Sequence, residues 1–342
     1  QTFTFKTNVD IIGNLALVRR NDRTLMHINF GANTVKVGGI ITKDGPNTSN
    51  RDIGRTYNMG TSTFELNGSA AQNTLGSTDM PATFHNVHIN NAAGITPQSA
   101  LVVNGTLQLT QGRLNLGNHN LTVGTISGGS ATSYIVTNGT GKVTRSAPAT
   151  TKLVFPVGTA TSYFELGLTP TIATSLSVRL STGVPQAAPS GRLFYNVTCH
   201  VETTNASATE LEFTPATPLV AGTGSFVGMW NGTSYDYVTA NRTANTYNVQ
   251  LHSFVPFVVG ESDEILNTHA LNSKLRMYAT NSKLTVEGLT PGMLIAIFNS
   301  KGQVVGSQSA SNSSHSFVLK SGVYVVQIRY KEQLTSTKVF VY

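Results

Sequence analysis

The chain has 342 residues, of which 11% are charged and 39% hydrophobic, and its formal net charge is +7. This length exceeds that of an ordinary single domain, and the hydrophobic fraction excludes a wholly disordered chain. The 23 Lys and Arg residues are scattered and form no basic stripe or recognisable module, so we do not expect a nucleic-acid partner. The densest basic cluster, residues 19–23, is typical of a solvated turn, and weak attraction to an anionic lipopolysaccharide or glycan is the alternative.

Cys199 is the single cysteine, which excludes an intrachain disulfide and a zinc site built on cysteines. It lies in an alternating segment, residues 194–201, and we predict that it is a small buried hydrophobic side chain. No apolar run reaches the length that a membrane-spanning helix needs. Abundant Asn, Thr, Ser and Gly with few charges favour an all-β extracellular protein.

An internal repeat marks the N-terminal region, which we assign to residues 1–145. Three seven-residue units, 104–110, 111–117 and 118–124, each combine a polar turn with an apolar-polar-apolar strand. Together they would form one turn of a parallel β-solenoid, about 21 residues long. An antiparallel meander with two-residue turns is the alternative. In the solenoid, the apolar positions of the units point inward and stack: Leu107, Leu109, Leu114, Leu116, Leu121 and Val123.

A second region, residues 146–262, begins where Pro148 and Pro156 are expected to interrupt the stack of coils. Alternation then returns in short segments, at residues 176–180, 195–201, 211–213, 227–230, 247–251 and 254–259. Strands at this spacing are typical of a β-sandwich, so we predict a central β-sandwich domain.

The last region, residues 263–342, contains short apolar or alternating segments separated by Gly, Pro, Asn and Ser, which are strand and hairpin signals. We predict a small immunoglobulin-like β-sandwich. Gly302 lies in a turn between two strands, where a positive φ costs glycine little. Gly322 is expected to play the same part before Tyr324.

Three segments of this region resemble the type A C-terminal sorting domain of Bacteroidetes type IX secretion cargo. Residues 297–305 resemble the family's hairpin, residues 319–328 its Gly-Val-Tyr strand, and residues 337–341 its terminal strand. The Pro-Asn-Pro that often opens the family's domain is absent, and residues 277–281 stand in its place. The single residues that carry the resemblance are Gly302, Val304, Gly322, Tyr324 and Lys338.

The resemblance implies export across the outer membrane, with recognition by a shuttle protein and the type IX translocon. A sortase-like protease would remove the domain between Gly260 and Lys274, often joining the new carboxyl end to an anionic lipopolysaccharide. The protein would then be secreted or held at the cell surface. Such cargo first crosses the inner membrane, so we expect that a signal peptide preceding Gln1 was removed.

The sequence contains no nucleophile elbow, phosphate-binding loop, zinc-protease motif or calcium loop, so we expect no catalytic site and no cofactor. His85 and His88 would project to opposite faces of a strand, so no metal site is predicted. Glu210 and Glu212 share the outer face of a strand, where solvated carboxylates are commoner than a glycosidase pair.

Three aromatic residues beside an Asn-Gly turn, Trp230, Tyr235 and Tyr237, are candidates for stacking on a sugar ring, although core or edge packing is the simpler interpretation. The whole pattern favours a non-catalytic surface protein, and residues 60–95 also resemble the repetitive region of many Bacteroidetes adhesins. A polysaccharide lyase or hydrolase on the solenoid is an alternative, but residues 86–141 contain no Asp or Glu for such a site. A passive stalk of a larger surface protein is a further alternative.

Overall fold

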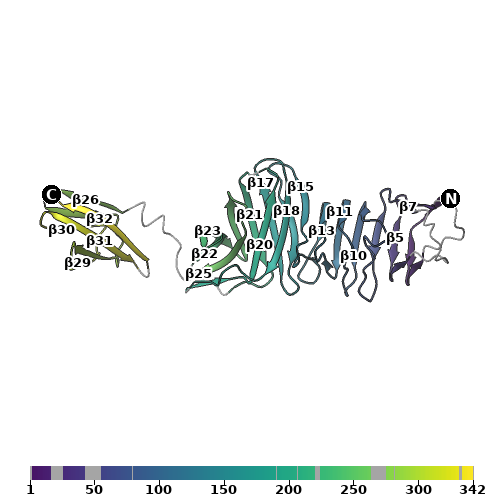
Figure 1. Cartoon of the computed structure of the whole chain (residues 1–342), viewed down its shortest axis with the longest axis horizontal. Helices are drawn as coiled ribbons and strands as arrows, with labels where there is room; N and C mark the ends of the chain where they lie inside the picture. The colour runs from purple at the N-terminus through teal and green to yellow at the C-terminus, as the bar shows by residue number, and fades with distance from the viewer. Residues whose placement is uncertain are drawn as a thin grey trace. The chain divides into compact units, whose positions relative to one another are not determined.

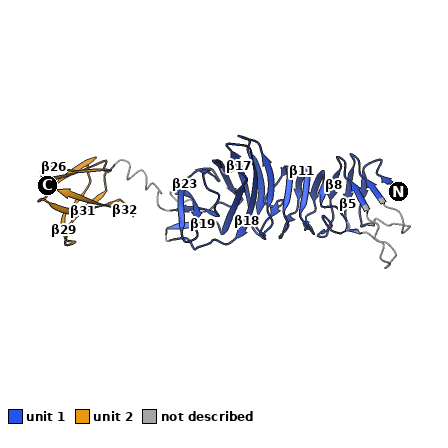
Figure 2. Cartoon of the chain, turned by 45° about the horizontal axis from the view of Figure 1, so that its top comes forward, with its two compact units in different colours: residues 1–263 blue, residues 264–342 orange. Residues whose placement is uncertain are grey.

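A computed structural model describes residues 2–16, 26–42, 55–78, 80–189, 191–205, 207–219, 224–262, 275–280, 282–330 and 333–341. Every element in these ranges is a β-strand, which confirms the all-β prediction. The described residues include no helix with the length and apolar character that crossing a membrane requires. The chain divides into two compact units, residues 1–263 and 264–342, which Figure 2 colours separately. The basic cluster at residues 19–23 lies outside the described residues.

The first unit begins with a β-solenoid of about six turns, as predicted. One face contains β1 (Thr2–Thr4), β4 (Met26–Asn29) and β7 (Arg55–Asn58), then β9 (Thr83–Phe84) and the first residues of β11 (Leu101–Gln111) and β13 (Leu121–Gly128). The second contains β2 (Val9–Ile11), β5 (Thr34–Val37), β8 (Thr63–Leu66), β10 (Asn86–Asn90) and the last residues of β11 and β13. The third contains β3 (Leu15–Ala16), β6 (Ile41–Thr42), β12 (Leu114–Asn115) and β14 (Ile135–Val136). Figure 1 shows these coils side by side along the solenoid.

The predicted inward positions of the repeat are correct. All six side chains are at most 3% exposed: Leu107, Leu109, Leu114, Leu116, Leu121 and Val123. Leu101 pairs in parallel with Leu121, and Leu114 pairs in parallel with Ile135, so one turn takes 20 or 21 residues here. Parallel pairing also excludes the antiparallel meander. Burying each such side chain contributes about 1.5–3 kcal/mol, so these stacked columns are the main source of stability in the solenoid.

An aromatic column holds the earlier coils in register. The rings of Phe5 and Phe30 stack with their centroids 5.0 Å apart, and Phe30 meets Phe64 edge-on at 5.9 Å. Phe64 lies 5.7 Å from Phe84. Each aromatic pair contributes about 0.5–1.5 kcal/mol beyond the burial of its area, so the column stabilises coils of unequal length.

The solenoid changes to antiparallel pairing at two strands. β15 (Val143–Ala147) pairs in parallel with β13 and antiparallel with β18 (Thr174–Thr182), while β16 (Leu153–Gly158) pairs in parallel with β14 and antiparallel with β17 (Tyr163–Pro170). Pro148 directly follows β15, as expected for a strand end. The expectation that Pro156 interrupts the stack is wrong, because Val157 and Gly158 beside it make the parallel pairing with β14.

Two antiparallel arms extend from β15 and β16 and meet on β23 (Tyr235–Thr243). One arm runs through β18, β20 (Val197–Thr203), β25 (Phe257–Ser262) and β22 (Gly224–Trp230) to β23, with β19 (Arg192–Phe194) beside β25. The other runs through β17, β21 (Thr209–Pro215) and β24 (Thr246–Leu251) to β23. Each predicted alternating segment overlaps one of these strands, and Cys199 is fully buried, as predicted. The sandwich assignment and the boundary at residue 145 stay predictions, since residue 145 lies within β15 and one core spans the solenoid and both arms.

A buried arginine closes the end of the second face. Among the described strands, none pairs with the far edge of residues 125–128. Arg145, 7% exposed, donates from Nη1 to the Val154 carbonyl at 2.9 Å and from Nε and Nη2 to the Gly124 carbonyl at 3.3 Å. Its guanidinium lies 5.5 Å from the Phe155 ring centroid. Arg145 therefore satisfies backbone acceptors at the point where strand stacking stops.

The second unit has two small sheets and a core of its own. β26 (Arg276–Thr280), β27 (Lys283–Glu287) and β30 (Ser314–Val318) form one sheet, and β29 (Val304–Ser309), β28 (Leu294–Asn299), β31 (Gly322–Tyr330) and β32 (Gln333–Val341) form the other. Residues 277–281, which replace the family's Pro-Asn-Pro, largely belong to β26. The buried core includes Leu284, Val286, Ile295, Ile297, Val326 and Ile328, and it is separate from the core of the first unit.

Because the two cores are separate, the units should unfold independently. We predict that Leu107→Ala destabilises the first unit by about 2–5 kcal/mol and that Ile295→Ala does the same to the second, since each removes a fully buried side chain. Hydrogen exchange followed by mass spectrometry during chemical denaturation reads both units at once. Exposed Gln108→Ala is the control on the same strand as Leu107. Loss of protection in both units from either core substitution would contradict their independence.

Candidate functional site

The residues that carry the sorting-domain resemblance lie in one sheet of the second unit. Phe298 of β28 pairs with Val304 of β29 on one side and with Val325 of β31 on the other. Val325 in turn pairs with Lys338 of β32. Val304 and Lys338 are therefore the two ends of one row across four strands. Spacing in the sequence alone does not predict this row, because it requires the strand order of the sheet.

This row belongs to an exposed apolar face. Val304 is 57% exposed, Phe340 is 51% exposed and Val325 is 37% exposed. The ammonium of Lys338 lies 5.4 Å from the centroid of the Phe340 ring. Residues 264–342 contain eight Lys or Arg and three Glu, and thus carry five of the seven net positive charges of the chain. An exposed apolar patch bordered by cations is typical of an interaction surface.

The two predicted turn glycines differ. Gly302 has a φ of +75° in the turn between β28 and β29, and its N–H donates to the Asn299 carbonyl at 3.0 Å, so that prediction is correct. Gly322 has no positive φ: it begins β31 and pairs with Val341. The expectation of a second left-handed glycine is wrong because the chain is already extended there. Tyr324 donates its hydroxyl to the Lys320 carbonyl at 2.8 Å, closing the turn before β31.

The aromatic candidates for sugar stacking do come together, but protein groups occupy their rings. Tyr235 lies 5.1 Å from Trp230 and 6.0 Å from Tyr237, measured between ring centroids. Tyr235 is 8% exposed, and its hydroxyl donates to the Gln186 carbonyl at 3.0 Å. The guanidinium of Arg192 lies 4.0 Å from the Tyr237 ring centroid. Packing accounts for this cluster, and sugar binding by it stays a prediction.

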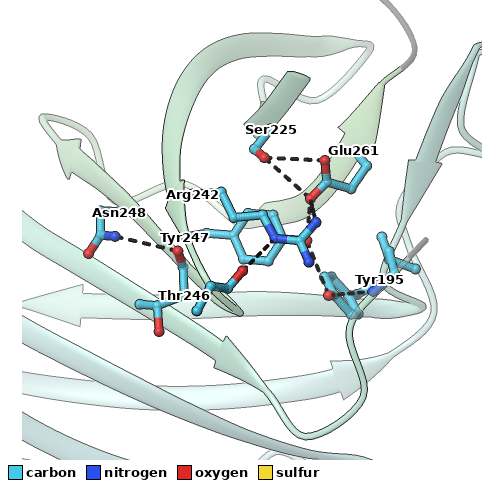
Figure 3. A network of polar contacts seen from close by, with 9 residues as sticks. Tyr195, Ser225, Arg242, Thr246, Tyr247, Asn248 and Glu261 are labelled. Atoms are coloured by element: carbon cyan, nitrogen blue, oxygen red, sulfur yellow. Dashed lines mark hydrogen bonds and ion pairs between the residues drawn. The ribbon is translucent and has the colours of Figure 1, made fainter. Parts of the chain in front are cut away.

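A buried charged network lies where the two arms of the first unit meet, and Figure 3 shows Glu261 at its centre. Glu261, 2% exposed, accepts hydrogen bonds at Oε1 from Tyr247 at 2.5 Å and from Arg242 at 2.7 Å. The Ser225 hydroxyl lies 3.2 Å from both carboxylate oxygens. Tyr195 and Tyr247 are joined through their hydroxyls at 3.2 Å. Burial, together with these bonds to Glu261 and Tyr195, raises the pKa of Tyr247 above its usual value, so the phenol stays protonated.

This network ties together strands that are far apart in the sequence. Its members come from β22, β23, β24 and β25, and β25 is the last described strand before the second unit. The expectation that a linker begins at Glu261 is wrong, because Glu261 and Ser262 are buried residues of β25. Backbone held in a buried strand is a poor protease substrate. The remainder of the predicted cleavage region, residues 263–274, lies outside the described residues.

The partly buried acid of the solenoid is also saturated by partners. Glu65 accepts from Asn90 at 2.9 Å, and its carboxylate lies 3.4 Å from Lys36 and 3.4 Å from His88. Burial raises the pKa of Glu65, but the Asn90 hydrogen bond and the charges of His88 and Lys36 outweigh it, so the pKa is lowered. A carboxylate held ionised in this way is suited to stabilising adjacent coils rather than to acid catalysis.

The other titratable candidates remain apart. The described residues contain no group of three or more His, Cys, Asp or Glu that could hold a metal ion. His88 contacts Thr110 at 2.9 Å in addition to Glu65. Glu210 is exposed as predicted, and Glu212 is paired with Lys152 at 2.6 Å. Sequence reasoning missed the Glu261 network, for which the one available signal is an acid that ends the apolar run of residues 257–260.

The Glu261 network should be important for stability. We predict that Glu261→Gln destabilises the first unit by about 3–5 kcal/mol, because it leaves Arg242 without its carboxylate in a buried setting. Glu212→Gln is the matched control, since it breaks a more exposed pair and should cost about 0–1 kcal/mol. Denaturant midpoints of the three proteins provide the comparison. Equal losses in the two variants would contradict a special role for Glu261.

His200 should make the first unit sensitive to acid. Burial, together with the charge of Arg179, lowers its pKa from 6.5 to about 4. The unfolded chain therefore binds a proton below pH 6.5 that the folded chain does not bind until about pH 4, so stability is fully present above pH 6.5 and falls as the pH drops through this window. We expect His200→Gln to flatten that part of the pH–stability curve. Exposed His252→Gln is the control, and a curve that His200→Gln leaves unchanged would contradict this assignment.

Comparison with known proteins adds no family. A scan of the chain against protein-family models and a search of curated proteins found no match. Function is therefore inferred from the motifs of the second unit and from the chemistry of the surfaces of both units.

Proposed function

We propose that the protein is type IX secretion cargo, with residues 264–342 as its C-terminal sorting domain and residues 1–263 as a non-catalytic, adhesin-like body displayed at the cell surface. The observation that supports this most directly is that the three resembling segments lie on β28, β29, β31 and β32, neighbouring strands of a unit with its own core. A sorting domain is read while it is joined to a folded body, so a separate core suits that role.

The exposed row from Val304 to Lys338 is the surface that we assign to the export machinery. Its apolar side chains can be buried by a shuttle protein or by the translocon at the outer membrane, and the excess of cations in residues 264–342 favours an acidic partner surface. A sortase-like protease would then cut within residues 263–274, which follow the buried end of β25. Joining of the new carboxyl end to an anionic lipopolysaccharide would hold the body at the surface.

The body has the features of a scaffold for adhesion. On the second face, small polar side chains lie in register across neighbouring coils: Thr34 pairs with Thr63, Thr63 with Asn86, and Thr106 with Thr125. Such a regular polar face provides a long contact surface. A polysaccharide-active enzyme is less well supported, because residues 86–141 contain no Asp or Glu.

Deletion of the second unit tests the export proposal. We expect the full chain to reach the cell surface of a type IX-competent cell and a chain ending at residue 263 to stay in the periplasm. Protease shaving of intact cells followed by fractionation measures the location of each protein. Resistance of the retained protein to limited proteolysis checks that the first unit is folded. Equal surface display of both chains, or equal display in a translocon-deficient strain, would refute the proposal.

A further inference from the structure

A groove on the solenoid lies at the turns that connect the second face to the third. It has a volume of about 420 Å³ and is lined by Ala92, Ala93, Gly94, Gly112, Arg113, Asn115, Thr132 and Ala160. The turns that form it belong to three successive coils and to the connection between β16 and β17. We propose that this groove binds a saccharide unit that carries a carboxylate, with Arg113 as the residue that recognises the carboxylate. The proposal goes beyond the export route and does not depend on it.

Arg113 is held in place by two contacts. Its Nη1 donates to the Ala160 carbonyl at 2.7 Å, and its guanidinium lies 5.0 Å from the centroid of the Tyr134 ring. Tyr134 is fully buried, and its hydroxyl donates to the Thr159 carbonyl at 3.0 Å, so the surface under the guanidinium is itself fixed. An arginine immobilised before binding loses little side-chain entropy when a ligand arrives.

The guanidinium retains unused hydrogen-bonding capacity. An arginine has five N–H donors in a planar fork that matches a carboxylate. Beyond the bond to Ala160, the Arg113 guanidinium donates to none of the described residues. A planar carboxylate is the ligand group that such a fork recognises best among sugar substituents.

The local charge favours an anion. Residues 80–164 contain no Asp or Glu, so no carboxylate of these coils competes for Arg113. The Asn115 amide and the Thr132 hydroxyl add polar groups that can bond sugar hydroxyls. The remaining lining residues are Gly and Ala, which leave room for a ring and offer it small apolar contacts.

The small size of one lining residue follows from the fold itself. A Cβ on Gly112 would lie 1.7 Å from the Asn91 carbonyl oxygen of the preceding coil, and its φ is +81°. This glycine therefore stays glycine whether or not a ligand binds. Ligand recognition is assigned to Arg113 and to the missing acids, so the variants that test it leave Gly112 unchanged.

Calorimetric titration of the purified full chain with trigalacturonate tests the proposal, and the neutral trisaccharide maltotriose is the control ligand. We expect trigalacturonate to bind and maltotriose not to bind, and Arg113→Gln to weaken binding by about tenfold or more, as expected for loss of a charge-assisted hydrogen bond. Ala93→Trp should also abolish binding by filling the groove without changing any charge.

Arg179→Gln is the matched control variant. Arg179 also donates to a backbone carbonyl, that of Gly139 at 3.3 Å, but it does not line the groove. Its substitution removes the same charge and should leave binding unchanged. Thermal unfolding of each variant checks that the first unit is intact. Absence of trigalacturonate binding, equal binding of maltotriose, or equal weakening by Arg113→Gln and Arg179→Gln would overturn the proposal.

Discussion

The fold of the first unit depends on one constraint: each coil can bury its apolar side chains only against the coils on either side. Val35, Phe64, Val87, Leu107 and Ile126 lie in register along the second face, and a slip of one residue would turn them all to solvent. A stack of this kind needs an end that stops it. β15 and β16 supply that end by pairing in parallel with the last coil and antiparallel with β18 and β17, and Arg145 satisfies the carbonyls left at the edge.

The same logic explains where the buried charges lie. The arms that grow from β15 and β16 must meet, and they do so on β23, where four strands converge around Glu261. The network fixes the end of β25, after which the chain passes to a unit whose core is separate. The body is thus a complete structure before the second unit begins, and this separation is what the proposed export role requires. A partner could bind or remove the second unit without opening the core of the first.

Local pattern predicted the fold wherever the repeat length was constant. The units at residues 104–124 identified the solenoid because turns of 20 or 21 residues keep their strands equally spaced. The earlier coils escaped notice because Val35 pairs with Phe64, 29 residues later, so the period changes. A signal was present there: Asn29 and Asn58 each accept a bond from a glycine two residues later at 3.1 Å, at Gly31 and Gly60. The Glu261 network could not be predicted, because its partners meet only through the pairing of distant strands.

The most direct test of the central claim is whether residues 264–342 alone direct export. These residues would be fused to a folded reporter that carries an inner-membrane signal peptide, and surface-exposed reporter would be measured in type IX-competent cells and in cells that lack the translocon. The account predicts reporter at the surface of the competent cells only. Reporter that remains periplasmic in competent cells, although the fused unit is folded, would contradict it.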